Sequence, residues 1–79
     1  MNPANQYRLQ KIFRELFDQP NLVLTADLSP ATVEEWDSVA MVQLVLAAEQ
    51  EFSVRLTTDE VASVRSAGDL LRLVEVKAP

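Results

Sequence analysis

Apolar residues recur at intervals of three and four along most of this chain, and this spacing restricts it to a helical fold. In the first segment the pattern is formed by Leu9, Ile12, Phe13, Leu16 and Phe17. These side chains fall on one side of an amphipathic helix. No stretch shows the apolar and polar alternation of a strand, and 79 residues leave room for one domain only. The sequence therefore predicts a single all-α domain over residues 1–79.

Two prolines indicate where the first helix begins and ends. Asn2 followed by Pro3 favours a helix start, because proline at the first helical position loses no hydrogen bond that it could have made. We expect Pro20 to end this helix. From there to Trp36 the chain predicts a long ordered connection, of a length that is uncommon in compact domains and is often functional. Its expected apolar anchors are Leu22, Leu24, Leu28 and Val33.

A second helix is predicted to begin at the tripeptide Trp36-Asp37-Ser38 and to end at about Phe52 or the residue after it. Asp37 is a favourable N-cap, because its carboxylate can accept a hydrogen bond from a free amide of the first turn. Trp36 then precedes the cap and can pack on Met41 as a hydrophobic staple. Ser38 is expected in the first turn, with its hydroxyl exposed.

Two further helices are predicted near the C-terminus. Thr57 and Glu60 have the spacing of a capping box, which indicates a short third helix over Thr58–Val64. Ser66 with Asp69 begins a fourth helix in the same way. The fold class that we expect is a small four-helix bundle in which three helices are longer and the third is short.

Composition excludes several functions. The chain has no Cys and no His, which removes thiol nucleophiles and the commonest general base and zinc ligand. A net charge of −5 opposes binding to nucleic acid or to an anionic membrane, and suits a partner with a basic surface. The acidic residues lack the spacing of a calcium loop. We expect no metal site, no membrane span, no leader segment and a cytoplasmic location.

Several motifs together resemble the acyl and peptidyl carrier proteins. The resemblance covers Tyr7 to Val76, and it rests on Asp37-Ser38-Val39, on Val42, Leu44 and Val45, on Glu49-Gln50-Glu51-Phe52 and on Ser66-Ala67-Gly68-Asp69-Leu70. The first of these is close to the Asp-Ser-Leu motif of the family. Two departures occur: Val39 replaces the usual Leu, and Ala40 and Gln43 stand where carriers of primary fatty-acid synthesis tend to have acids.

The resemblance implies that Ser38 receives a 4′-phosphopantetheine arm from coenzyme A, through a separate magnesium-dependent phosphopantetheinyl transferase. The thiol of the arm would carry acyl or aminoacyl groups as thioesters between a loading enzyme and downstream synthases or transferases. Asp37 would cap the helix and help the transferase to hold its metal ion. The chain itself would be a monomer and would catalyse nothing. The neutral Ala40 and Gln43 favour polyketide, nonribosomal-peptide or modified-lipid synthesis over the housekeeping fatty-acid pathway.

The physical chemistry of Ser38 agrees with this role. A phosphodiester on its hydroxyl would lie beside the free amides of a helix N-terminus, where the helix dipole favours negative charge. No base in the motif activates the hydroxyl, so Ser38 is expected to be a substrate of another enzyme rather than a nucleophile of its own.

The apolar residues of the second helix cover more of its surface than one core can bury. One group comprises Met41, Leu44, Val45, Ala48 and Phe52, and a second comprises Val39, Val42 and Leu46. Together they span roughly 200°, against the stripe of about 100° that a surface helix needs. Either the long connection or the third helix covers the second group, Val42 in particular, or this group is a docking stripe for partner enzymes. In the second case the partner-binding residues are Val39, Val42, Gln43, Leu46 and Glu49.

Two other functions remain open from the sequence. The chain could be a carrier-like interaction module that keeps the fold and is never modified. It could also be a small hydrolase or lyase that uses its carboxylates, although these are expected on helix surfaces without a convergent polar partner.

Overall fold

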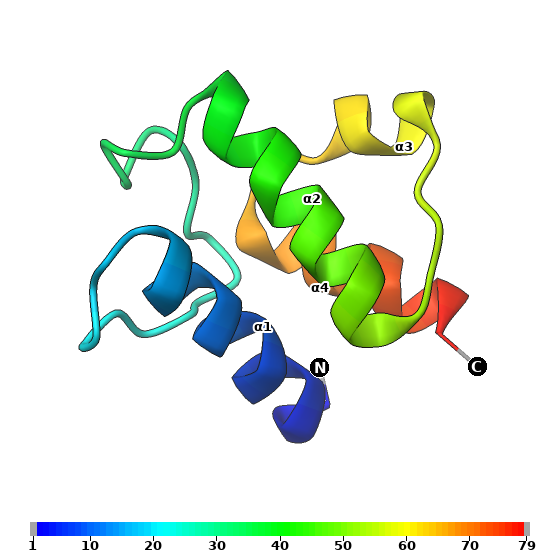
Figure 1. Ribbon diagram of the computed structural model, residues 1–79, viewed down its shortest axis with the longest axis horizontal. Helices are drawn as coiled ribbons and strands as arrows, with labels where there is room; N and C mark the ends of the chain where they lie inside the picture. Colours follow the sequence, from blue (N-terminus) through cyan, green and yellow to red (C-terminus); the bar gives the residue numbers. More distant parts are fainter. Residues whose placement is uncertain (1, 79) are drawn as a thin grey trace.

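Four α-helices form the computed structural model, which describes residues 2–78 (Figure 1). They are α1 (Pro3–Leu16), α2 (Ser38–Phe52), α3 (Thr58–Ser63) and α4 (Ala67–Lys77). In Figure 1, α2 crosses in front of α4, α1 lies beside α2, and α3 lies at the end of the molecule where α2 begins. No strand occurs in residues 2–78. The predicted all-α bundle with a short third helix is confirmed.

The first helix starts as predicted and ends earlier than predicted. The Asn2 side chain accepts a hydrogen bond from the Ala4 amide at 2.9 Å, which caps the N-terminus. The helix ends at Leu16 rather than at Pro20. Asp18 takes a left-handed conformation with φ of 52°, and the Gln19 amide donates back to the Arg14 carbonyl at 3.0 Å. This is the Schellman ending, in which a residue with positive φ closes the last turn.

The long connection between α1 and α2 is ordered by hydrogen bonds to both α1 and α4. Leu22, Leu24 and Val33 are buried as predicted, and Leu28 is partly buried. On one side the Gln10 side chain accepts from the Leu24 amide at 2.8 Å. The connection is therefore held in a fixed position against the core and is not a free loop.

On its other side the connection packs directly against the start of α4. The Gly68 amide donates to the Ala26 carbonyl at 3.0 Å, and the Ala67 amide donates to the Leu28 carbonyl at 2.7 Å. A Cβ atom on Gly68 would lie only 2.8 Å from that Ala26 oxygen. Glycine is therefore required here, because any side chain would push the connection away from α4.

The short helix α3 is attached mainly by polar contacts, since it has no buried residue. Thr57 and Glu60 form the predicted capping box, with hydrogen bonds of 2.8 and 3.1 Å. Glu60 also pairs with Lys77 of α4 at 2.7 Å, and this hydrogen bond, together with that from the Thr57 amide, lowers the pKa of Glu60. The helix ends at Ser63, one residue before the predicted boundary.

The core lies between α1, α2 and α4. Its largest fully buried side chains are Phe13, Leu9, Leu44, Leu70, Leu71 and Val74. Trp36 joins this core from the end of the connection, with 3% of its surface exposed. Its ring meets the Phe13 ring edge-on, with centroids 5.3 Å apart and planes at 83°, and Phe17 completes the cluster. Trp36 is thus buried in the core and anchors the end of the connection there.

We expect Trp36→Ala to lower the free energy of unfolding by about 3–5 kcal/mol, because it removes a buried aromatic side chain and leaves a cavity. For a domain of this size that is a large share of the total stability. Chemical denaturation followed by circular dichroism measures the change. Tyr7→Ala is the control, since 58% of Tyr7 is exposed and surface changes cost about 0.5 kcal/mol or less. Equal midpoints for the two variants would contradict the anchoring role of Trp36.

Candidate functional site

The beginning of α2 is fixed by Asp37. Its backbone is extended, and its Oδ1 accepts a hydrogen bond from the Ala40 amide at 2.8 Å. The Asp37 carbonyl accepts from the Met41 amide at 2.9 Å. Within residues 2–78 the amides of Ser38 and Val39 have no hydrogen-bond acceptor. The helix therefore begins with two free N–H groups beside the Ser38 side chain.

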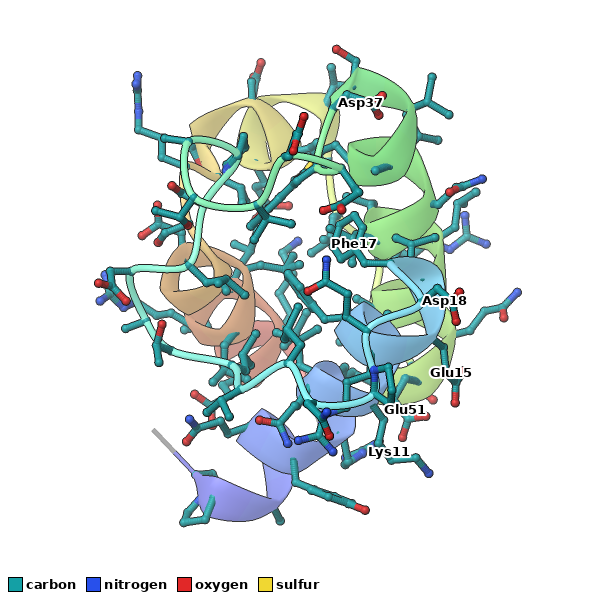
Figure 2. The ribbon with its side chains drawn as sticks, turned by 90° about the vertical axis from the view of Figure 1, so that its left-hand side faces the viewer. Lys11, Glu15, Phe17, Asp18, Asp37 and Glu51 are labelled. Atoms are coloured by element: carbon teal, nitrogen blue, oxygen red, sulfur yellow. The ribbon has the colours of Figure 1, made fainter. Side chains whose placement is uncertain are left out.

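Trp36 holds this helix start against the core. Its indole Nε1 lies 3.4 Å from the Met41 sulfur, so the predicted contact between the residue before the cap and the fourth helical residue is present. Two residues later, Ser38 is exposed. Figure 2 shows Asp37 at the upper end of the molecule and Phe17, whose ring contacts Trp36, near its middle. The anchor thus fixes where the Ser38 backbone lies without covering its hydroxyl.

Ser38 has the surroundings of a modification site rather than of a catalytic nucleophile. The chain contains no His, and the neighbouring carboxylate of Asp37 is engaged in the cap. The hydroxyl therefore has no imidazole beside it to act as the usual general base. A phosphate group on Ser38 fits what is present, because the free amides of the first turn and the positive end of the helix dipole both favour an anion.

The second apolar group of α2 is exposed. Val39, Val42 and Leu46 have exposed fractions of 67, 59 and 56%, and Gln43 is exposed beside them. Neither the connection nor α3 covers Val42, so the expectation that one of them shields it is wrong. These four side chains form a continuous surface along α2, which we call the α2 stripe, and it begins next to Ser38.

Glu49, the remaining residue of the expected docking surface, is partly buried and makes a structural hydrogen bond. Its Oε2 accepts a hydrogen bond from the Leu56 amide at 2.8 Å, which ties the link after α2 back to the helix. One carboxylate oxygen of Glu49 is thus engaged in a structural contact, and its role in docking stays a prediction. This hydrogen bond could not be predicted from the sequence, because it depends on the path of residues 53–56, which returns Leu56 to α2.

Ala40 and Gln43, the two positions where carriers of primary fatty-acid synthesis tend to have acids, lie in different surroundings. Ala40 is buried in the core cluster, whereas Gln43 is exposed. Of these two positions, only that of Gln43 therefore affects the charge of the exposed surface of α2. The burial of Ala40 could have been found from its spacing of four residues to Leu44 and eight to Ala48, which are also buried.

Neither a metal-binding cluster nor a membrane-spanning helix occurs in the described part of the chain. Among residues 2–78 there is no group of three or more acidic, His or Cys side chains close enough to hold a metal ion. In that same range no helix has the length and apolar character needed to cross a membrane. Ser38 and the α2 stripe are thus the features that a function has to explain.

Comparison with known proteins identifies the family of this chain. The family model described as the phosphopantetheine attachment site matches residues 8–74. The holo acyl carrier protein of Geobacter metallireducens, whose solution structure is known, superposes with a TM-score of 0.86. It is 30% identical, and the match covers 94% of this chain and 85% of that one.

An acyl carrier protein from Acidothermus cellulolyticus is 41% identical over 51 residues, which is 65% of this chain. The match spans 54% of the length of that relative. The chain belongs to the phosphopantetheine-attachment family of carrier proteins, whose prosthetic group is covalently attached phosphopantetheine.

The role of Asp37 as a cap gives a direct prediction. We expect Asp37→Ala to lower the free energy of unfolding by about 1 kcal/mol, because the Ala40 amide loses its acceptor. Asp37→Asn is the matched variant and should stay close to the wild type, since asparagine caps equally well. Thermal and urea denaturation provide the measurement. A loss of similar size in both variants would show that the charge of Asp37, and not its cap, stabilises the helix.

Proposed function

We propose that this chain is a carrier whose Ser38 Oγ bears the phosphopantetheine arm through a phosphodiester. The observation that carries the proposal is the exposed Ser38 hydroxyl at the capped start of α2, in a chain of this family. The thiol of the arm supplies the thioester bond to an acyl or aminoacyl group. The chain would hold and present that group, and the chemistry would belong to its partner enzymes.

Each residue near Ser38 has a defined task in this proposal. Asp37 and Trp36 hold the start of α2 in one position, so that a phosphopantetheinyl transferase meets a fixed backbone with a free hydroxyl. The amides of Ser38 and Val39 are available to the phosphodiester oxygens. We propose that Asp37 also helps the transferase to hold its metal ion. It would do so through Oδ2, because Oδ1 is engaged in the cap.

We further propose the α2 stripe as the docking surface for partner enzymes, which comprise the transferase, an acyl- or aminoacyl-loading enzyme, and downstream synthases or transferases. Its support is the exposure of three aliphatic side chains in a row that starts beside Ser38. The neutral Gln43 on this surface favours partners of a polyketide, nonribosomal-peptide or modified-lipid pathway. A monomeric state and a cytoplasmic location stay predictions.

Intact-mass spectrometry tests the attachment site. After incubation with coenzyme A and a broad-range phosphopantetheinyl transferase, the wild-type chain should gain the mass of one arm. Ser38→Ala should gain none, whereas the control Ser63→Ala, which removes an exposed serine hydroxyl from α3, should be modified fully. An unmodified wild type would support the alternative of a carrier-like interaction module. An arm that persists in Ser38→Ala would place the attachment on another residue.

The docking surface is tested by charge substitution. Val39→Asp and Leu46→Asp should keep the helical circular-dichroism spectrum, because both side chains are mainly exposed. Each should lower kcat/KM for transfer to a partner enzyme by about tenfold or more, which corresponds to about 1.4 kcal/mol, since a carboxylate would be buried in an apolar contact. Val76→Asp is the matched control, as Val76 is an exposed valine of α4. Unfolding of the stripe variants, or kinetics equal to those of Val76→Asp, would refute this assignment.

A further inference from the structure

A furrow runs between α1 and α2, directly beside the α2 stripe. Its first part is a hollow of about 270 Å³ that is lined by Ile12, Glu15, Leu16, Gln43 and Ala47. Because Gln43 also belongs to the α2 stripe, the two surfaces meet along α2. A second hollow, of about 180 Å³, shares Ile12 and Glu15 with the first and continues to Glu51 near the end of α2. We call the two hollows together the α1–α2 furrow.

The floor of the furrow is apolar. Ile12, Leu16 and Ala47 form it, and all three are partly buried. Ala47 contributes only a methyl group, which leaves the space beside Ile12 unfilled. Covering such a floor with another apolar group removes apolar surface from water, which is favourable. The furrow is therefore shaped to receive an apolar side chain, whereas the α2 stripe presents its own.

Two unpaired charges of opposite sign stand on the α1 side of the furrow. Lys11 and Glu15 line it and are exposed, and neither takes part in an ion pair within residues 2–78. They are four residues apart, so they lie on the same side of α1, one turn from each other. Figure 2 shows both on the outside of the molecule, where α1 lies beside α2. From Ser38 to Ala48, α2 has no charged residue of its own.

The segment that fits this furrow is a helix. Both of its walls belong to helices, whose backbone N–H and C=O groups are bonded within α1 and α2. An extended segment on this floor would therefore find no partners for its own backbone groups. A helix bonds its backbone internally and packs its rows of side chains into a groove between two other helices. From Gln43 to Glu51 the furrow extends for about 12 Å, which is about two helical turns.

We propose that the α1–α2 furrow receives an amphipathic helix of the enzyme that loads the arm. This helix places an apolar side chain over Ile12 and Ala47. It also sets an acidic side chain against Lys11 and a basic one against Glu15, one turn apart. The inference rests on the proposed function, because a loading enzyme acts only on a chain that bears the arm.

The place of the furrow along α2 favours the loading enzyme over the transferase. A transferase has to bring its catalytic groups to the Ser38 hydroxyl itself. A loading enzyme reacts with the thiol at the far end of the arm, so it holds the carrier at a distance from Ser38. The furrow begins five residues after Ser38 and reaches Glu51, which is about 20 Å further along the helix. It therefore suits an enzyme that acts on the end of the arm.

Filling the furrow tests its role. In Ala47→Leu a larger side chain occupies the hollow beside Ile12. The kcat/KM for thioester formation on the holo chain by its loading enzyme should fall about tenfold or more, which corresponds to about 1.4 kcal/mol. The rate of arm attachment by a broad-range transferase should stay the same. Ala62→Leu is the matched control, because Ala62 is exposed on α3, and it should keep both rates.

Circular dichroism and the thermal midpoint verify that each variant is folded. If Ala47→Leu does not fold, Ala47→Met replaces it, since the unbranched methionine side chain adapts to an irregular space.

Exchanging the two charges tests the pattern. Lys11→Glu and Glu15→Lys in one chain keep the net charge and reverse its order along α1. The KM of the holo chain in the loading reaction should rise about fivefold with kcat unchanged, because two weak attractive pairs become repulsive. The rise should shrink at high ionic strength, where exposed charges are screened. The matched chain with Lys11→Arg and Glu15→Asp keeps the order of the charges and should stay close to the wild type.

A photo-cross-link identifies the occupant. In Gln43→Cys a benzophenone label is attached before the arm is added, because the chain has no other cysteine. Irradiation of the holo form with the purified loading enzyme should join the label to a helix that has one apolar face and an acid and a base four residues apart.

The outcomes separate the two proposals. No arm on the wild type would overturn the proposed function, and this inference with it. An arm on the wild type, with loading equal in Ala47→Leu and in the charge-exchanged chain, would overturn the inference alone. So would an equal loss of arm attachment and loading in Ala47→Leu, or a cross-link to an extended segment or to a second copy of this chain.

Discussion

The edge-on contact between Trp36 and Phe13 is the interaction on which the rest of this structure depends. It joins the end of the long connection to α1, and so fixes where α2 can begin. The cap by Asp37 then sets the first turn of α2, with Ser38 outside the core and Ala40 inside it. The buried side chain of Trp36 thereby determines the position of the exposed Ser38. A residue that separate enzymes have to recognise and modify requires such a fixed position.

Most of the fold could be predicted because its signals are local. Apolar spacing located the helices, and side-chain caps located three of their starts within one residue. The end of α1 was missed, because the left-handed residue that closes it is Asp18 rather than the glycine that usually marks such a turn. The packing of Gly68 on Ala26 was also beyond prediction, since it joins segments far apart in the sequence.

The candidate site also combines features that local sequence rules predict with features that depend on distant parts of the chain. The exposure of Ser38 followed from its place after an N-cap, which is a local rule. The uncovered state of Val42 and the structural hydrogen bond of Glu49 depend on the paths of the connection and of residues 53–56, and apolar spacing contains no information about these.

The most direct test of this account is a comparison of amide ¹H–¹⁵N spectra before and after attachment of the phosphopantetheine arm. The account predicts that the largest shifts fall on the amides of Ser38 and Val39, while core amides such as those of Leu9 and Leu70 keep their positions, because the scaffold is complete before the arm arrives. Shifts centred on another residue, or spread through α1 and α4, would contradict it.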